Sequence, residues 1–186
     1  MVEKKDNYYV AILRGINVSG KNMIKMPALV KLFEQIGCKD VKTYVQSGNV
    51  IFKHPLVKTK DFEKQIRELI EKELNLKVPV IIFEENYLQK VKIDNPFVIE
   101  NDIDLSKLHV TFLSDEPTKE NAAKISADQF LPDEFVIDKK VIYLHCPVSY
   151  GNTKLTNNYF ENKLKVTATT RNWKTVNALA ELVSAG

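Results

Sequence analysis

The order of apolar patterns along the chain most constrains its fold, because it reads as strand, helix, two strands, helix, strand. The run NYYVAILR has almost no polar interruption, as in a strand that is covered on both faces or central in a sheet. After Pro27, apolar residues recur at helical spacing until Gly37, which predicts a helix over about 27–36. VKTYVQSGNVIF predicts a hairpin around Ser47-Gly48, a helix follows from about Asp61, and KVPVIIF predicts a strand.

This β-α-β-β-α-β order is that of the ferredoxin-like split βαβ arrangement, and the second half of the chain repeats it. KLHVTFL and VTATT predict its first and last strands, and EFVID and KVIYLHC predict a hairpin about Lys139. The helices predicted in this half cover 118–127, 154–164 and a final apolar-striped segment, 172–184.

The expected fold class is therefore α+β, with two ferredoxin-like (β-α-β-β-α-β) repeats, antiparallel or mixed sheets, and a C-terminal helix. Residues 86–106 contain Pro96 and several Asp and Asn residues, which predicts a short helix and a connector. We expect a first ferredoxin-like subdomain over 1–94 and a second one, with the C-terminal helix, over 95–186.

Composition indicates an ordinary globular protein, with 44% hydrophobic and 27% charged residues in a chain of 186. The longest apolar stretches fall well short of the ~20 residues that cross a bilayer, and the start lacks a signal-peptide pattern, so we expect a cytoplasmic protein. Cys38 and Cys146 lie far apart without zinc-ligand spacing, which favours two reduced thiols, no metal and no recognisable cofactor.

Charge is unevenly divided between the two halves. Residues 1–93 hold 17 Lys and Arg against 11 Asp and Glu, a net charge of +6, and the remainder holds 10 against 13, a net charge of −3. A basic N-terminal half allows an anionic partner, although such an excess is also compatible with an ordinary solvated surface.

The segment GINVSGKN nearly matches a phosphate-binding P-loop, with Gly15, four residues, Gly20 and Lys21. Asn22 stands where the magnesium-binding Ser or Thr belongs, and the helical pattern begins only near residue 26. In the expected topology, the carboxylate of Glu84 lies at the opposite edge of the sheet. The sequence therefore argues against a nucleoside-triphosphatase loop.

A looser anion-binding role stays open for this segment. The first two strands run parallel in a split βαβ unit, so RGINVSGKN and QSGN should meet at one sheet edge. The glycines allow close approach by a ligand. The candidate ligand-binding residues here are Arg14, Asn17, Lys21, Asn22, Gln46, Ser47 and Asn49. The alternative is that these side chains only tie the loop to the hairpin.

A second polar segment, TTRNW, lies between the last predicted strand and helix. Thr169, Thr170 or Asn172 is expected to cap that helix, and Arg171 would give a bidentate donor for an anion. The loop CPVSYGNTK leaves its strand at the same edge, which would place Asn152 and Lys154 near Arg171. The alternative is a capped helix with Trp173 in the core and Arg171 in a structural ion pair.

Several motifs together resemble the bacterial domain of unknown function 1697 family. They are LRGINVSGKN, YVQSGNVIF, NPF, LHVTFL, VIYLH, TKL and ATTRNWKTVNALAEL, in matching order from residue 10 to 183. The resemblance implies a small bacterial α+β protein without an assigned activity. Where that family typically has Gly-Gly before Lys-Asn, this chain has Ser19-Gly20, and YGNTKL replaces a Gly-rich turn before Ser-Lys-Leu.

Catalytic patterns are sparse. The three histidines are scattered, and His145 and Cys146 are neighbours on a strand, so they should point to opposite faces. RNA binding would need exposed aromatic residues on the central strands, which carry Tyr8, Tyr9 and Phe52, but the RRM signature is absent.

We therefore expect the protein to bind a phosphorylated small molecule or nucleotide. An RNA-binding module, a protein-interaction module and an enzyme with unrecognised catalytic residues are the alternatives. Whether the two polar segments form one site, and the oligomeric state, stay open.

Overall fold

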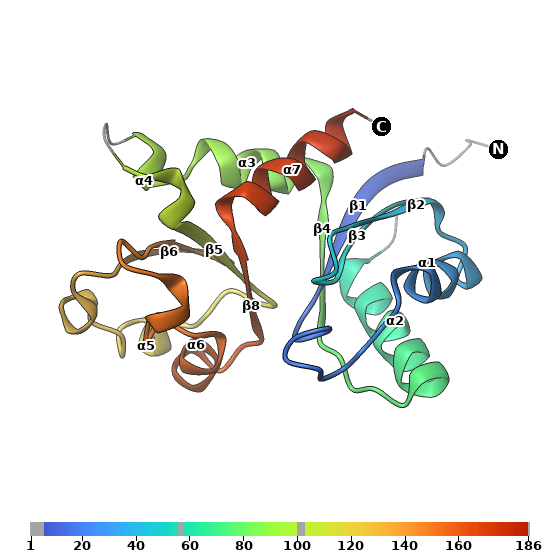
Figure 1. The fold of residues 1–186 in the computed structure, drawn as a ribbon, viewed down its shortest axis with the longest axis horizontal. Helices are drawn as coiled ribbons and strands as arrows, with labels where there is room; N and C mark the ends of the chain where they lie inside the picture. Colours follow the sequence, from blue (N-terminus) through green and yellow to red (C-terminus); the bar gives the residue numbers. More distant parts are fainter. Residues whose placement is uncertain (1–5, 56–57, 100–102, 186) are drawn as a thin grey trace. The chain divides into compact units, whose positions relative to one another are not determined.

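The computed structural model of the chain describes residues 6–55, 58–99 and 103–185. Over these residues the fold is mixed α+β, with two four-stranded antiparallel sheets and seven α-helices (Figure 1). The chain divides into unit 1, which comprises Met1–Gln89 and Leu179–Gly186, and unit 2, which comprises Lys90–Ala178. Each unit contains one sheet. The subdomain boundary between residues 94 and 95 stays a prediction about independently folding segments.

Unit 1 has the element order that the sequence predicts. The elements are β1 (Asp6–Leu13), α1 (Met26–Gln35), β2 (Lys39–Tyr44), β3 (Asn49–Pro55), α2 (Thr59–Leu74) and β4 (Val80–Glu84). The strand order in the sheet is β2-β3-β1-β4, and each neighbouring pair is antiparallel. Since β1 and β2 are both antiparallel to β3, they run in the same direction and end at the same edge.

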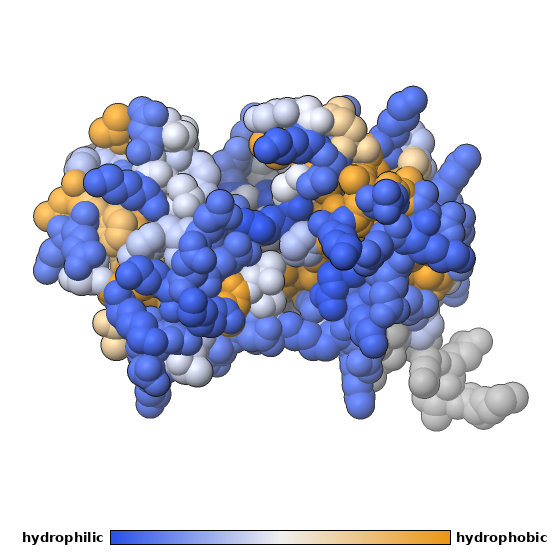
Figure 2. Space-filling view, turned by 90° about the horizontal axis from the view of Figure 1, so that it is seen from below, coloured by the Kyte–Doolittle hydropathy of each residue, from blue (hydrophilic) through white to orange (hydrophobic). Residues whose placement is uncertain are grey.

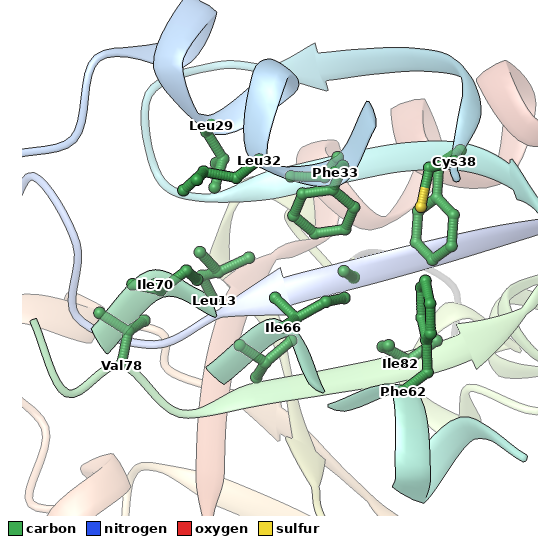
Figure 3. Close-up of a cluster of buried hydrophobic side chains, with 14 of the residues drawn as sticks. Leu13, Leu29, Leu32, Phe33, Cys38, Phe62, Ile66, Ile70, Val78 and Ile82 are labelled. Atoms are coloured by element: carbon green, nitrogen blue, oxygen red, sulfur yellow. The ribbon is translucent and has the colours of Figure 1, made fainter. Parts of the chain in front are cut away.

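The core of unit 1 lies between the sheet and the two helices, α1 and α2. Leu29 and Phe33 of α1 and Ile66 of α2 point into this layer, where they meet side chains of β1 and β4 (Figure 3). Pro27 lies in the first turn of α1, where its missing N–H has no intrahelical partner to lose. Asn75 ends α2 in a left-handed conformation, with a φ of 53°.

Two of the three aromatic residues behind the RNA-binding alternative belong to this core. Tyr9 and Phe52 are opposite each other in the register of β1 and β3, and their ring centroids lie 5.7 Å apart. Both side chains are fully buried on the face covered by the helices. The third, Tyr8, is half-buried beneath the ammonium of Lys53. Tyr9 and Phe52 are therefore not accessible for stacking on a base.

Unit 2 repeats the strand order of unit 1. Its strands are β5 (Leu108–Leu113), β6 (Glu134–Asp138), β7 (Val141–His145) and β8 (Ala168–Asn172), in the antiparallel order β6-β7-β5-β8. The helices α5 (Lys119–Ala122) and α6 (Asn157–Leu164) follow β5 and β7. The predicted hairpin about Lys139 is confirmed, because Asp138 pairs with Val141 across a two-residue turn.

Some predicted boundaries in the second half are wrong. The helix α6 begins at Asn157, not at residue 154, because the hydroxyl of Thr156 caps it by accepting a hydrogen bond from the Tyr159 N–H. The helix α5 is a single turn. The remaining helices are α3 (Glu85–Ile93), α4 (Pro96–Ile99) and α7 (Trp173–Ser184). Over the residues that the structure describes, no helix has the length and apolarity to span a bilayer.

In each unit, a glutamate of the helix that precedes the last strand of the sheet accepts a hydrogen bond from that strand. In unit 1, Oε1 of the buried Glu63 accepts a hydrogen bond of 2.9 Å from the Ile82 N–H of β4. In unit 2, Oε1 of Glu161 accepts one of the same length from the Ala168 N–H of β8. These carboxylates satisfy backbone donors that a terminal strand cannot pair with a further strand.

The substitution Glu63→Ala should lower the free energy of unfolding by ~1–3 kcal/mol, because it leaves the Ile82 N–H without an acceptor in a buried place. Glu63→Gln keeps an acceptor oxygen and should lose clearly less. Urea denaturation of both variants measures the difference. Equal losses would contradict the hydrogen bond as the cause and would point to the ion pair of Glu63 with Lys60.

Candidate functional site

Two loops of unit 1 meet at one edge of its sheet, as the sequence predicts. One loop, residues 14–25, connects β1 to α1, and the other, residues 45–48, connects β2 to β3. The side-chain amide of Asn17 donates a hydrogen bond of 2.9 Å to the carbonyl oxygen of Gln46. The predicted meeting of these segments is therefore confirmed, and we call residues 14–25 and 45–48 together the loop pair.

Asn17 is the central hydrogen-bonding residue of the loop pair. Its Oδ1 accepts from the Ile24 N–H at 2.8 Å, and its Nδ2 donates to the Ile24 carbonyl at 2.9 Å. Its backbone N–H donates to the carbonyl of Asn22. Asn17 has a φ of 54°, a left-handed conformation that Asn tolerates better than most residues. The long loop is thereby folded back on itself and joined to the hairpin.

The tip of the long loop is a two-residue turn. Val18 pairs with Lys21 in an isolated antiparallel bridge, and the Lys21 N–H donates to the Val18 carbonyl at 2.9 Å. Ser19 and Gly20 have φ values of 50° and 74°, as a type I′ turn requires at both central positions. The turn exposes the side chain of Lys21 to solvent.

The other predicted amides also support the backbone of the loop pair. Nδ2 of Asn22 donates to the carbonyl of Gly15 at 3.0 Å. Nδ2 of the fully buried Asn49 donates to the Tyr44 carbonyl and to the Ser47 hydroxyl, both at 3.0 Å. Of the seven residues predicted for this site, Asn17, Asn22, Ser47 and Asn49 thus have scaffold contacts. Of the remaining three, Arg14 is half-buried, and Lys21 and Gln46 are exposed.

The hairpin packs closely on β1 at Gly48. The Leu13 N–H donates to the Gly48 carbonyl at 2.8 Å. A Cβ at Gly48 would lie 2.8 Å from both Cδ1 of Ile16 and Cβ of Leu13, and the φ of Gly48 is 79°. Both the space and the backbone conformation therefore require glycine. Val45, at the other end of the same loop, also has a left-handed conformation, with a φ of 49°. This conformation is unusual for a β-branched residue.

The loop pair does not have the architecture of a P-loop. The helix α1 begins at Met26, four residues after Asn22, so its N-terminal amides do not continue the glycine-containing turn. Glu84 pairs with Tyr9 of β1, whereas the loop follows Leu13 at the other end of that strand. The topological objection from the sequence is therefore confirmed.

In unit 2, the predicted TTRNW residues are part of β8 and the start of α7. Oδ1 of Asn172 accepts a hydrogen bond of 2.8 Å from the Thr175 N–H, so Asn172 caps α7. Arg171 is buried, and its Nη1 donates to the hydroxyl of Thr169 and to the carbonyl of Thr170. Burial lowers the pKa of Arg171 to about 10, which leaves the guanidinium protonated at neutral pH.

Sequence reasoning missed a polar cluster beside β8. The ring of His109 stacks on Tyr150 with 4.4 Å between centroids. The hydroxyl of Thr170 donates a hydrogen bond of 2.7 Å to Oδ1 of Asn157 and shares one of the same length with the hydroxyl of Thr111. Burial raises the pKa of Tyr150 and lowers that of His109, which keeps both side chains neutral near pH 7. The signal for Tyr150 was its place in CPVSYGNTK, the loop that the topology brings to the end of β8.

Asn152 and Lys154, from the same loop, line an open pocket of ≈ 250 Å³ together with residues 129–133. Arg171 is not part of that lining. That Asn152 and Lys154 lie near Arg171 stays a prediction. The other wall of the pocket, residues 129–133, has no strong pattern in the sequence.

The described residues offer no further catalytic or metal constellation of an established kind. No group of three or more His, Cys, Asp or Glu residues in the described ranges is placed to hold a metal ion. His145 contacts Glu134 at 3.2 Å, whereas Cys146 is in the hydrophobic core, as their alternation on a strand predicts. Polar residues cover most of the surface visible in the space-filling view, and apolar residues form separate patches (Figure 2).

Comparison with known proteins identifies a family and a similar solved structure. The family model described as "Protein of unknown function (DUF1697)" matches residues 7–143. The structure of the conserved bacterial protein SP0830 from Streptococcus pneumoniae is similar to this chain, with a TM-score of 0.73 and 20% identity. The similarity covers 96% of this chain and 99% of that one. At this identity it shows a shared fold alone. Comparison with curated proteins gives no significant match.

Replacing Gly48 by Ala should destabilise unit 1 more than replacing Gly20 by Ala. Both positions have a similar left-handed φ, which costs ~1–2 kcal/mol for alanine, but a Cβ at Gly20 meets no atom within 4 Å. The clash at Gly48 should add ~1–3 kcal/mol. Chemical denaturation of the two variants measures this difference, and equal losses would mean that the hairpin moves away from β1 without cost.

ATP with magnesium should not be hydrolysed above background, because Asn22 lacks the metal-binding hydroxyl and Glu84 is at the wrong edge. A phosphate-release assay measures this. Turnover that disappears in Lys21→Ala would contradict the assignment of this loop.

Proposed function

Because the chain belongs to the DUF1697 family, whose description assigns no activity, we propose a function from its own residues: the loop pair binds a phosphorylated small molecule or nucleotide. The observation that carries this proposal is the set of three side-chain hydrogen bonds from Asn17, which joins the two loops before any ligand arrives. A preorganised site loses less conformational entropy when it binds a ligand. The amides of Asn17, Asn22 and Asn49 serve this scaffold.

The cationic groups for the ligand come from two residues of the long loop. Arg14 is its first residue, and Lys21 ends the turn at its tip. Lys21 is exposed at the tip, and Gln46 adds an exposed amide from the neighbouring loop. Ser19 and Gly20 are successive left-handed residues in a turn, and successive backbone N–H groups in turns often form anion-binding concavities. The net charge of +6 over residues 1–93 adds a long-range attraction for a phosphorylated ligand.

The proposal also includes the repeated architecture of the fold and the cellular location of the protein. We take the common strand order of the two sheets as the mark of two ferredoxin-like repeats. We place the protein in the cytoplasm, where its two buried cysteines would stay reduced.

A second candidate function is a protein-interaction module that uses the same loop pair. Val18, Met23 and Val45 are large apolar residues on these loops and expose 56%, 66% and 51% of their surface. Apolar side chains exposed in one region favour contact with another protein. A phosphorylated ligand depends on Arg14 and Lys21, whereas a protein partner would depend on Val18, Met23 and Val45.

The test separates binding from stability. Lys21→Ala should change the free energy of unfolding by less than ~0.5 kcal/mol, as at other exposed sites, and should abolish the rise in melting temperature given by the ligand. The probes are inorganic phosphate, pyrophosphate, AMP, ATP and a sugar phosphate, each measured by thermal melting. Lys72→Ala, an exposed lysine on α2, is the matched control and should keep the ligand effect.

The variant Arg14→Ala distinguishes a ligand-binding role of Arg14 from a role in holding the loop pair together. If Arg14 serves the ligand, its loss should leave the unliganded melting temperature nearly unchanged and remove the ligand effect. If Arg14 braces the loop pair, its loss should cost ~1–3 kcal/mol. A large destabilisation by Arg14→Ala, with no probe shifting the wild-type protein, would refute the binding site.

A further inference from the structure

The pocket of unit 2 lies between two loops that flank the β6–β7 hairpin. One wall is formed by residues 129–133, which precede β6, and the other by residues 148–154, which follow β7. Its volume of ≈ 250 Å³ is just below the range of roughly 300–1,000 Å³ that is usual for drug-sized ligands. The pocket therefore suits a smaller molecule, of metabolite size.

Hydrogen bonds hold both walls. The Asp133 N–H donates to the Phe130 carbonyl at 2.8 Å, which closes the first wall. In the second wall, the hydroxyl of Ser149 accepts from the Gly151 N–H, and the ammonium of Lys107 donates to the Val148 carbonyl at 3.1 Å. The pocket is thus formed by folded loops and does not depend on a ligand for its shape.

The lining carries one charge of each sign. Lys154 is exposed and Asp133 is half-buried, and neither makes an ion pair with another residue in the described ranges. Burial and the negative charge of Asp133 raise the pKa of the Cys146 thiol to about 11. An ammonium and a carboxylate in one small pocket disfavour a ligand that carries a single kind of charge.

Apolar side chains complete the lining. Phe130 is buried, whereas Leu131 and Val148 expose 71% and 64% of their surface beside the opening. Exposed apolar residues at a concave site lose unfavourable contact with water when an apolar group covers them.

We propose that this pocket binds an α-amino acid with an apolar side chain. The carboxylate of the amino acid pairs with the ammonium of Lys154, its ammonium pairs with the carboxylate of Asp133, and its side chain lies against Leu131 and Val148. Charge-assisted hydrogen bonds to the two charged groups orient the ligand, and the apolar contact selects its side chain. The site is in unit 2 and is independent of the function proposed for the loop pair.

The test uses L-leucine and two analogues that each lack one charge. The analogues are 4-methylpentanoate, which lacks the ammonium, and 3-methylbutylamine, which lacks the carboxylate. In ¹H–¹⁵N correlation spectra of the full chain, L-leucine at about 10 mM should shift the amide signals of Gln129, Asp133, Ser149 and Asn152. Each analogue should bind at least about tenfold more weakly, because one charge-assisted contact is lost.

Variants assign the two charges. Lys154→Ala and Asp133→Asn should each weaken leucine binding at least about tenfold, and Asp133→Asn should also remove the preference for leucine over 4-methylpentanoate. Lys174→Ala, an exposed lysine on α7, is the control and should bind as the wild type does.

Two results would overturn the proposal. One is the absence of shifts at these four amides with L-leucine. The other is binding of inorganic phosphate or 4-methylpentanoate as tight as that of leucine, which would show that Lys154 acts alone.

Discussion

The side chain of Asn17 bonds both backbone groups of Ile24 and the carbonyl of Gln46, and the arrangement of the loop pair depends on these contacts. A single side-chain amide thus satisfies three backbone groups: it accepts a hydrogen bond from one N–H and donates hydrogen bonds to two carbonyls. Only a side chain with both a donor and an acceptor satisfies all three groups. Arg14 and Lys21 belong to the same long loop that these contacts of Asn17 fold back on itself.

Much of the fold follows from local chemistry in the sequence, as the hairpin at Ser47-Gly48 and the cap at Asn172 show. Turn residues and caps act over a few positions, so their effect is legible without the tertiary structure. The meeting of RGINVSGKN with QSGN was also predictable, because it depends only on β1 and β2 running in the same direction.

The roles of individual side chains were less predictable. Asn17, Asn22 and Asn49 have the donors of a binding site, but the same donors satisfy loop carbonyls, and sequence alone does not distinguish these uses. The residues that follow Tyr9 in β1 are buried on both faces of the sheet. The alternation of apolar and polar residues therefore does not indicate which face the helices cover. The pocket of unit 2 is lined by two irregular loops, residues 129–133 and 148–154. No local sequence pattern predicts that these two loops lie side by side.

The glutamates at the end strands have a consequence for how copies of this chain behave together. An extended segment from another molecule that lengthened either sheet at β4 or β8 would meet the N–H groups of Ile82 and Ala168, which Glu63 and Glu161 already occupy. To pair there it would have to displace a carboxylate, which in the case of Glu63 is buried. Intermolecular strand addition, the first step of many aggregation routes, is thereby disfavoured at one edge of each sheet.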